Sequence, residues 1–297
     1  MSGTAPTPDP AAHYDRVTPA WSIILGDDLH HGLFEGDDLD LATATENLTA
    51  ALATAADLRP AARIVDLGCG TGAQACWLAR RYSAASVIGV STSAVGVAMA
   101  RQRSEDAGVA DVVSFDCGNA LDSGLPEATF DVVWLLESSQ YLGPRPQLLR
   151  ECARLLVPGG RVALCDVVLK RPLQLRDVRR LNRELDVLRD TFGEAVLATP
   201  EEYRQAVRMA GLELIRECDL TERVLPTFGC WRERARRERE RVIPLIGDAG
   251  LATFLAGCDV MEQFFAEGIV GYSLIAARKP PEAPRRPPGR TREKPAT

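Results

Sequence analysis

The sequence contains no closely spaced pair of cysteines. None of its eight cysteines forms a C-x-x-C, the spacing typical of zinc ligands and redox-active pairs, so we expect no metal site. Several lie within apolar runs, which indicates buried free thiols. Free thiols fit a reducing compartment, so we expect a cytoplasmic protein. The cysteines stand at positions 69, 76, 117, 152, 165, 218, 230 and 258.

An excess of basic charge is also missing. The net charge of −6 gives no general basic face for phosphates, so no nucleic-acid partner is expected. No apolar run approaches the roughly 20 residues of a membrane span, so no membrane partner is expected either. The stretch MSGTAPTPDPAA has neither a basic segment nor an apolar core, which argues against a secretory signal.

The length of 297 residues and the hydrophobic share of 46% allow one large α/β domain with a cap. Prolines and polar residues predict disordered tails at 1–12 and 280–297. Between these tails we distinguish three regions. These are an N-terminal helical lid (13–56), a ligand-binding core (57–170), and cap helices with the last two strands (171–279).

Within the core, short apolar runs alternate with helical patterns. We predict strands at RPAARIVDL, ASVIGV, DVVSF, FDVVWLL and GRVALCDVVL, and helices over 39–56, 71–82, 93–107 and 146–156. VPGG, at 157–160, is expected to stop the last helix before the fifth strand. Apolar strands separated by helices indicate a doubly wound, mostly parallel α/β sheet covered on both faces.

The pattern loosens after residue 170. Helical stretches at about 172–192 and 200–210 precede a strand at LELIRECDL. A long helical insertion over 229–267 then precedes a last strand at IVGYSLIAAR. The insertion contains RERARRERERV, whose mixed charges predict an exposed helical face rather than a nucleic-acid patch.

The turn VDLGCGTG, with Gly68, Gly70 and Gly72, follows the first strand of the predicted sheet. Ligands bind at this edge, and glycine allows the backbone to approach them closely. A dinucleotide site would have G-x-G-x-x-G and an acidic residue after the second strand, where this chain has Val90 and Ser91. A phosphate-binding loop would need G-K-[ST]. Both nucleotide-phosphate interpretations are therefore weak.

With VIGVSTS, FDCGNALDSGLPEATFDVVW and RLLVPGGRVAL in the same order and intervals, the turn resembles the class I S-adenosylmethionine-dependent methyltransferases. The resemblance covers residues 60–170. It implies a Rossmann-like sheet of seven strands, S-adenosyl-L-methionine as cofactor and S-adenosyl-L-homocysteine as its product. It is strongest to the small-molecule branch, with its sugar O-methyltransferases, sarcosine-type N-methyltransferases and geranyl diphosphate C-methyltransferases.

The resemblance also implies which residues hold the cofactor. Ser91 and Thr92 would meet the ribose, in place of the usual acid, and Asn119 and Ala120 the adenine. Asp66 would orient the amino group or the loop. The turn residues placed against the methionine end are Gly68, Cys69, Gly70 and Gly72.

An aromatic segment, HYDRVTPAWSIILGDDLHHGLFEG, contains all three histidines and is expected to cover the cofactor. Aromatic faces stabilise a sulfonium cation when water is excluded. We therefore predict that Tyr14 and one of His30 and His31, with His31 the preferred candidate, close over the donor. The alternative is a solvated loop with aromatic anchors. A homo-oligomer through this segment is also an expectation.

The stretch LLESSQYLG has Gln140 and Tyr141 where the O-methylating relatives carry a His pair, and glutamine is no base. Its E-S-x-x-Y resembles the geranyl diphosphate C-methyltransferases. Glu137 and Tyr141, with Tyr203 and Trp231 from the cap, are therefore predicted to shield a carbocation and remove a proton. Two alternatives stay open: Glu137 holds the cofactor's amino group, and Asp166 is either an auxiliary base or a structural carboxylate.

The cap is rich in aromatic residues, which predicts a roomy apolar pocket for a lipophilic secondary metabolite. The leading expectation is methylation of a prenyl, terpenoid or aromatic carbon, which cyclisation could follow. O- or N-methylation, with Asp166 or a lid histidine as the base, is the first alternative. A cyclase that keeps the cofactor as a scaffold is the second. The aromatic residues are Phe192, Tyr203, Phe228, Trp231, Phe254, Phe264 and Phe265.

Overall fold

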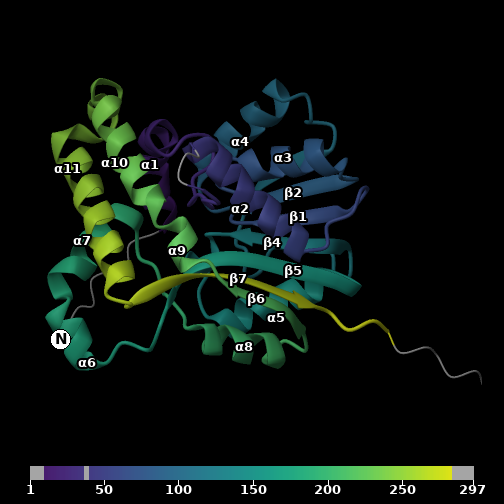
Figure 1. Cartoon of the computed structure of the whole chain (residues 1–297). Helices are drawn as coiled ribbons and strands as arrows, with labels where there is room; N and C mark the ends of the chain where they lie inside the picture. The colour runs from purple at the N-terminus through teal and green to yellow at the C-terminus, as the bar shows by residue number, and fades with distance from the viewer. Residues whose placement is uncertain (1–9, 37–39, 283–297) are drawn as a thin grey trace, which may run out of the picture.

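A seven-stranded sheet forms the centre of the computed structural model, which describes residues 10–36 and 40–282 (Figure 1). The strand order is β3-β2-β1-β4-β5-β7-β6, and only β7 is antiparallel to its neighbours. The predicted doubly wound, mostly parallel sheet is therefore confirmed. The strands are β1 (Arg63–Leu67), β2 (Ser86–Ser91), β3 (Val113–Cys117), β4 (Phe130–Leu136), β5 (Leu156–Leu169), β6 (Glu213–Asp219) and β7 (Val270–Arg278).

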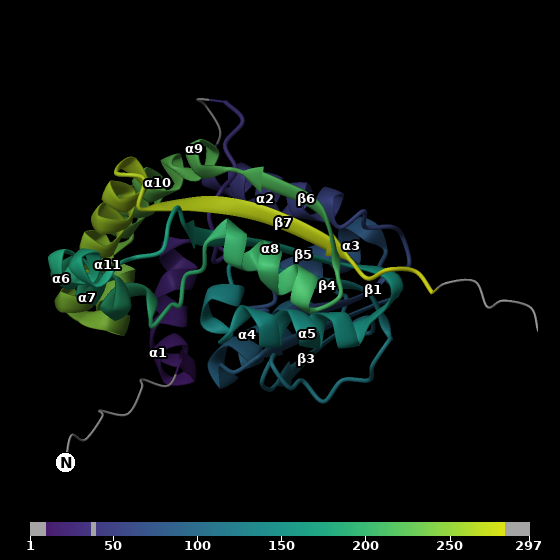
Figure 2. The same cartoon turned by 90° about the horizontal axis from the view of Figure 1, so that it is seen from below.

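Helices cover both faces of this sheet (Figures 1 and 2). Successive side chains of a strand point to opposite faces, so Ile64 belongs to one hydrophobic core and Val65 and Leu67 to the other. The first core lies under α2 (Leu41–Ala55), α3 (Ala73–Tyr82) and α4 (Ala94–Asp106). The second lies under α5 (Arg145–Leu155) and α8 (Pro200–Met209). Burial on both faces explains why the strands are continuous apolar runs.

The remaining helices form a cap beyond the carboxyl ends of the parallel strands (Figure 1). The longest of them, α11, packs against α1, α7 and α10, and buries Phe254 and Phe264. By length and composition alone α11 could also cross a membrane, a property shared by core helices of soluble proteins. The cap helices are α1 (Pro10–Ile24), α6 (Leu175–Arg180), α7 (Asn182–Phe192), α9 (Thr221–Val224), α10 (Pro226–Arg237) and α11 (Arg239–Ala266).

Several predicted boundaries are wrong. Helix α1 begins at Pro10, so residues 10–12 of the predicted tail are helical, while 1–9 and 283–297 lie outside the described residues. α5 ends at Leu155, just before VPGG as expected, but VPGG does not separate the helix from the strand. β5 already begins at Leu156, which pairs with Phe130, and VPGG is accommodated as a bulge before Arg161 pairs with Val132.

The expected helical stretches of the cap are present, each as more than one helix. The stretch expected over 172–192 consists of α6 and α7, which meet at Leu181. The insertion expected over 229–267 is α10 followed by α11, which is itself kinked at Gly247. The physical reason at the kink is backbone geometry, since Gly247 has a φ of 72° and a ψ of 169°, outside the helical region.

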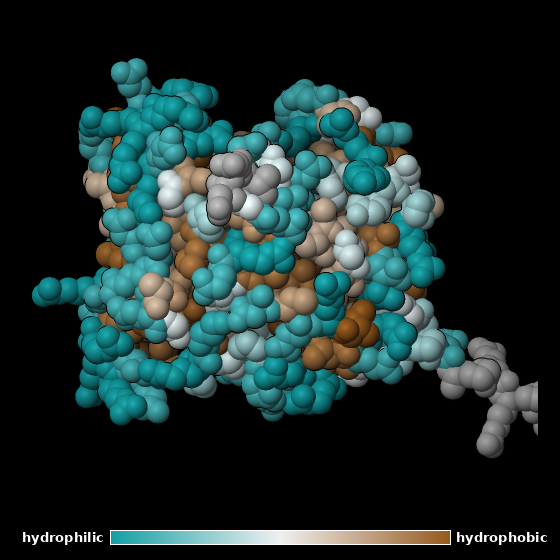
Figure 3. Space-filling model, viewed as in Figure 1, coloured by the Kyte–Doolittle hydropathy of each residue, from teal (hydrophilic) through white to brown (hydrophobic). Residues whose placement is uncertain are grey.

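Hydrophilic residues dominate the face shown in Figure 3, where apolar residues form separate patches. Exposed large apolar side chains come from different elements, and scattered ones of this kind are normal on a soluble surface. They are Leu175, Val178, Val196, Met209, Leu214, Ile215 and Leu245.

Two helical glycines of the cap provide a matched test of its packing. A Cβ on Gly257 of α11 would lie 2.4 Å from Oγ1 of Thr191 in α7, whereas one on Gly229 of α10 would meet no atom within 4 Å. We expect Gly257→Ala to lower the free energy of unfolding by about 1–3 kcal/mol through overpacking. Gly229→Ala should raise it by roughly 0.5–1 kcal/mol through helix propensity. Urea unfolding of both variants checks this, and equal effects would contradict the close contact of α7 with α11.

Candidate active site

A cavity of about 830 Å³ lies between the sheet and the cap. On the sheet side its wall is formed by the turns that follow β1, β2, β3 and β4. On the cap side it is formed by residues of α1, α7, α10 and α11. Its volume is within the range of small-molecule sites, and its position is where open α/β sheets bind their ligands.

The glycine turn has three left-handed glycines, with φ of +91° at Gly68, +52° at Gly70 and +75° at Gly72. A Cβ on Gly68 would lie 2.2 Å from Cβ of Ser138, and one on Gly72 would overlap Phe115. These two positions are glycine because protein atoms leave no room. A Cβ on Gly70 would meet no protein atom within 4 Å, and Gly70 lines the cavity. The turn therefore leaves space for a ligand at Gly70.

Most of the predicted cofactor residues line the same cavity. Strands β1 and β2 end side by side, and the turn after β1 is bonded to the end of β2. The amides of Gly68 and Cys69 both donate to the carbonyl of Val90, at 2.8 and 3.2 Å. Burial raises the pKa of the Cys69 thiol well above its usual range, which keeps it neutral. The predicted cofactor residues in the wall are Tyr14, His31, Gly68, Cys69, Gly70, Ser91, Thr92, Asn119, Ala120 and Glu137.

Four of the predicted site residues lie behind the cavity wall instead: Asp66, Gly72, Asp166 and Tyr203. Burial raises the pKa of Asp66 to about 7, and its Oδ2 has no hydrogen-bond partner among the residues described. Asp166 accepts a hydrogen bond from Ser139, and burial raises its pKa to about 7 as well. Tyr203 is fully buried beside the same Ser139, at 2.6 Å.

Glu137 follows β4 and lines the cavity in a left-handed conformation with a φ of +54°. Such a conformation is costly for a non-glycine residue and is concentrated at functional sites. Its Oε1 accepts hydrogen bonds from the amide of His31 (2.7 Å), Nδ1 of His31 (2.8 Å) and the hydroxyl of Tyr272 (2.7 Å). Its Oε2 has no hydrogen bond to any described residue and remains open to the cavity.

Burial by itself would raise the pKa of Glu137, but the charge and hydrogen bond of His31, with His30 and Tyr272, outweigh it and lower the pKa. Glu137 is therefore ionised at neutral pH. The sequence named Glu137 but gave no signal for Tyr272, which is 135 residues further along the chain.

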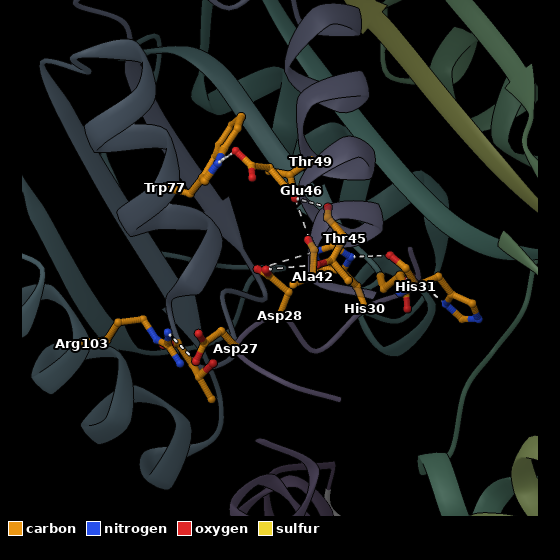
Figure 4. A network of polar contacts seen from close by, with 12 residues as sticks. Asp27, Asp28, His30, His31, Ala42, Thr45, Glu46, Thr49, Trp77 and Arg103 are labelled. Carbon is orange, nitrogen blue, oxygen red and sulfur yellow. Dashed lines mark hydrogen bonds and ion pairs between the residues drawn. The ribbon is translucent and has the colours of Figure 1, made fainter. Parts of the chain in front are cut away.

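The two lid histidines have different positions. His31 lines the cavity, with its ring centroid 4.9 Å from that of Trp231. His30 lies outside the cavity wall, where its Nδ1 donates to the carbonyl of His31 at 2.7 Å. Burial opposes a charge on His30, yet the neighbouring Asp28 raises its pKa overall. Figure 4 shows His30 and Asp28 beside Thr45 and Thr49 of α2, contacts that hold the segment around His30 against α2.

Helix α1 brings two further groups to the site. Tyr14 and Tyr141 pack edge to face with ring centroids 5.3 Å apart. Asp15, which the sequence analysis did not name, accepts from the hydroxyl of Ser93 at 2.6 Å and from the amide of Val95 at 3.1 Å. A carboxylate is favoured at this N-terminus of α4 by the exposed amides and the helix dipole. Asp15 therefore holds α1 against the start of α4 at the edge of the cavity.

The fold, the glycine turn and the cavity define a class of protein, and sequence comparison agrees with it. A family model described as a methyltransferase domain matches residues 65–164. The chain belongs to the class I S-adenosylmethionine-dependent methyltransferases, in the branch that acts on natural products, and its cofactor is S-adenosylmethionine.

Similar proteins include the 27-O-demethylrifamycin SV methyltransferase of Amycolatopsis mediterranei (strain S699). It is 34% identical over 279 residues, which are 93% of this chain and 99% of the relative. Methyltransferase GfsG of Streptomyces halstedii is 31% identical, over 90% of this chain and 93% of its own length. Among solved structures, the [4+2]-cyclase SpnF superposes with a TM-score of 0.78 at 26% identity, over 95% of this chain and 100% of SpnF.

Gly70 provides a test of cofactor binding. Gly70→Ala should weaken S-adenosylhomocysteine binding at least tenfold, or about 1.4 kcal/mol, because the new methyl group occupies the ligand's space. Gly108→Ala is the matched control, since Gly108 has a similar φ of +66°, also meets no atom within 4 Å and lies away from the cavity. Calorimetric titration measures both affinities. An equal loss in the two variants would place the cofactor elsewhere.

Asp66 makes stability dependent on pH. Because its pKa is about 7 when folded and 3.8 in its usual state, the folded protein binds the extra proton between these values, and stability falls as pH rises through this window. Asp66→Asn should therefore gain stability relative to the parent by on the order of 1–4 kcal/mol between pH 4 and pH 8. Chemical unfolding of the cofactor-free protein measures this. The exposed Asp111→Asn should show no such trend, and a flat Asp66→Asn difference would contradict the burial argument.

Proposed function

We propose that the protein transfers the methyl group of S-adenosylmethionine to a hydroxyl oxygen of a bulky lipophilic natural product. The observation that carries this proposal is the carboxylate of Glu137, with Oε1 held by three donors and Oε2 open to the cavity. A fixed acid with one free oxygen can orient an acceptor hydroxyl and take its proton.

The cofactor fits the turn at Gly70 and the residues that line the cavity beside it. When bound, S-adenosylmethionine supplies an electrophilic methyl group. The acceptor's O–H would donate to Oε2 of Glu137. As the new O–CH3 bond forms and the S–CH3 bond of the cofactor breaks, the hydroxyl proton would pass to Oε2, and the products would be a methyl ether and S-adenosylhomocysteine. A methylated hydroxyl is a strong acid until it loses this proton. A carboxylate of lowered pKa is therefore a sufficient base.

The cap side of the cavity favours a lipophilic acceptor. Its wall consists mainly of aliphatic and aromatic side chains, which bind apolar surface by excluding water from it. These are Trp21, Leu25, Leu173, Leu185, Leu188, Phe192, Leu197, Phe228, Met261, Phe264 and Ile269. The relative from A. mediterranei supports the same class of acceptor, since its name gives 27-O-demethylrifamycin SV as the compound that it methylates.

Oxygen is preferred here to the carbon acceptor that the sequence favoured. That expectation depended on the missing His pair at Gln140 and Tyr141, but a base need not come from those positions when Glu137 is held by His31. Carbon methylation is the second candidate because the rings of His31, Trp231, Phe228 and Tyr272 lie together and could shield a carbocation. We also propose a cytoplasmic location and a homo-oligomer. Helix α1, in the segment expected to form the oligomer contact, packs against α4, α10 and α11 of its own chain.

Methyl transfer is tested with ¹³C-methyl-labelled cofactor, a metabolite extract of the host, and 27-O-demethylrifamycin SV as a probe acceptor. We expect a product one methyl heavier with the ¹³C shift of a methyl ether. A shift typical of carbon-bound methyl would favour the second candidate. A metabolite of the extract that is converted to a new compound without gaining the label would support the scaffold cyclase instead.

Glu137→Gln should lower kcat by roughly 10²–10⁴-fold, because the amide keeps the shape but cannot take the proton. Glu194→Gln is the matched control, since Glu194 is an exposed carboxylate at the same cavity with no hydrogen-bonded partner in the described structure. If Glu137→Gln instead weakened S-adenosylhomocysteine binding more than tenfold and left kcat unchanged at saturation, Glu137 would hold the cofactor and the base would have to be sought elsewhere.

A further inference from the structure

A buried polar cluster lies behind the acceptor side of the cavity and is not used by the chemistry proposed above. It consists of Ser139, Arg145, Asp166 and Tyr203. The Tyr203 hydroxyl lies 2.6 Å from Oγ of Ser139 and accepts from Nε of Arg145 at 2.9 Å. The Ser139 hydroxyl donates to Asp166. None of these four residues lines the cavity and all four are buried, so their role in the site is indirect.

Arg145 is the unusual member of this cluster. It is 5% exposed, yet among the described residues no carboxylate lies within ion-pair distance of its guanidinium. Burying a cation without an ion pair is expensive, so its donors must be well satisfied. Nη1 donates to the carbonyl of Gly143 at 2.8 Å, Nη2 donates to that of Val196 at 2.5 Å, and the Tyr203 ring lies 5.3 Å from the guanidinium carbon.

These contacts join two segments that are distant in sequence and that both line the cavity. One is the turn 138–143, and the other is the segment 193–197 that follows α7. The amide of Val196 donates to the carbonyl of Gln140 at 2.9 Å, so the two segments are also bonded directly. The Gln140 side chain is 8% exposed, lines the cavity and has no hydrogen bond to any residue the structure describes. Its amide therefore remains available to a ligand.

We propose that Arg145 and Tyr203 are positioning residues for the acceptor. They lock the segment 193–197 onto the turn 138–143, so that this wall of the acceptor site, including the Gln140 amide, is formed before the acceptor arrives. The guanidinium suits this task because its planar fork fixes several donors at once, which a lysine ammonium does not. The inference rests on the proposed binding of a small-molecule acceptor in this cavity.

The test uses the full chain with S-adenosylhomocysteine bound and the variants Arg145→Lys and Tyr203→Phe. Arg154→Lys is the matched control. Arg154 lies on the same helix α5, its Nη2 is 2.7 Å from Oε1 of Glu151, and neither residue lines the cavity. Hydrogen exchange should show the Val196 amide opening at least tenfold faster in both test variants and unchanged in the control. S-adenosylhomocysteine affinity should stay within threefold of the parent.

With labelled cofactor and the host extract, the apparent KM for the extract should rise at least tenfold while kcat stays within threefold. Unchanged exchange at 193–197 would overturn the proposal. So would faster exchange throughout the protein with an equal loss of cofactor affinity, since that pattern is general destabilisation. If no acceptor in the extract takes up label, the proposed function fails while the exchange result still decides whether these residues fix the wall.

Discussion

The carboxylate of Glu137 is the point on which the rest of the site depends. Its Oε1 is held by donors from two distant parts of the chain, His31 of the lid and Tyr272 of β7, while the backbone of Glu137 keeps a left-handed conformation at the end of β4. A buried charge needs such donors to persist. These donors fix Oε1 and leave Oε2 without a hydrogen bond to any described residue. The orientation of the carboxylate therefore depends on the packing of His31 and Tyr272 against it.

The sheet side of the cavity is formed mainly by backbone, and the cap side by side chains. On the sheet side, glycine backbone and the ends of parallel strands shape the wall where we propose that the cofactor binds, and close packing against Ser138 and Phe115 fixes the turn. On the cap side, side chains from α1, α7, α10 and α11 provide the wall. Backbone geometry tolerates little change, whereas side chains on helices can be exchanged one at a time.

The fold could be predicted from the sequence because alternating apolar strands and amphipathic helices are local patterns. VPGG shows the limit, since a proline and two glycines indicate an interruption but not whether it ends a helix or forms a bulge within β5. Asp166 and Tyr203 show another. On β5, Val167 and Leu169 line the cavity while Asp166 points behind it, because adjacent residues alternate between faces. A strand that is apolar on both sides carries no sign of which face meets the ligand.

The sequence by itself determined the sheet, the glycine turn and the kind of cofactor, because these depend on residues within a few positions of one another. Only the tertiary structure decided that His31 faces the cavity while His30 contacts Thr49 of α2, although the two histidines are neighbours (Figure 4). It alone brought His31 to Glu137 across 106 residues and placed Arg145 between two cavity segments. Those contacts follow from how the cap packs on the sheet, and packing between distant segments leaves no local pattern in the chain.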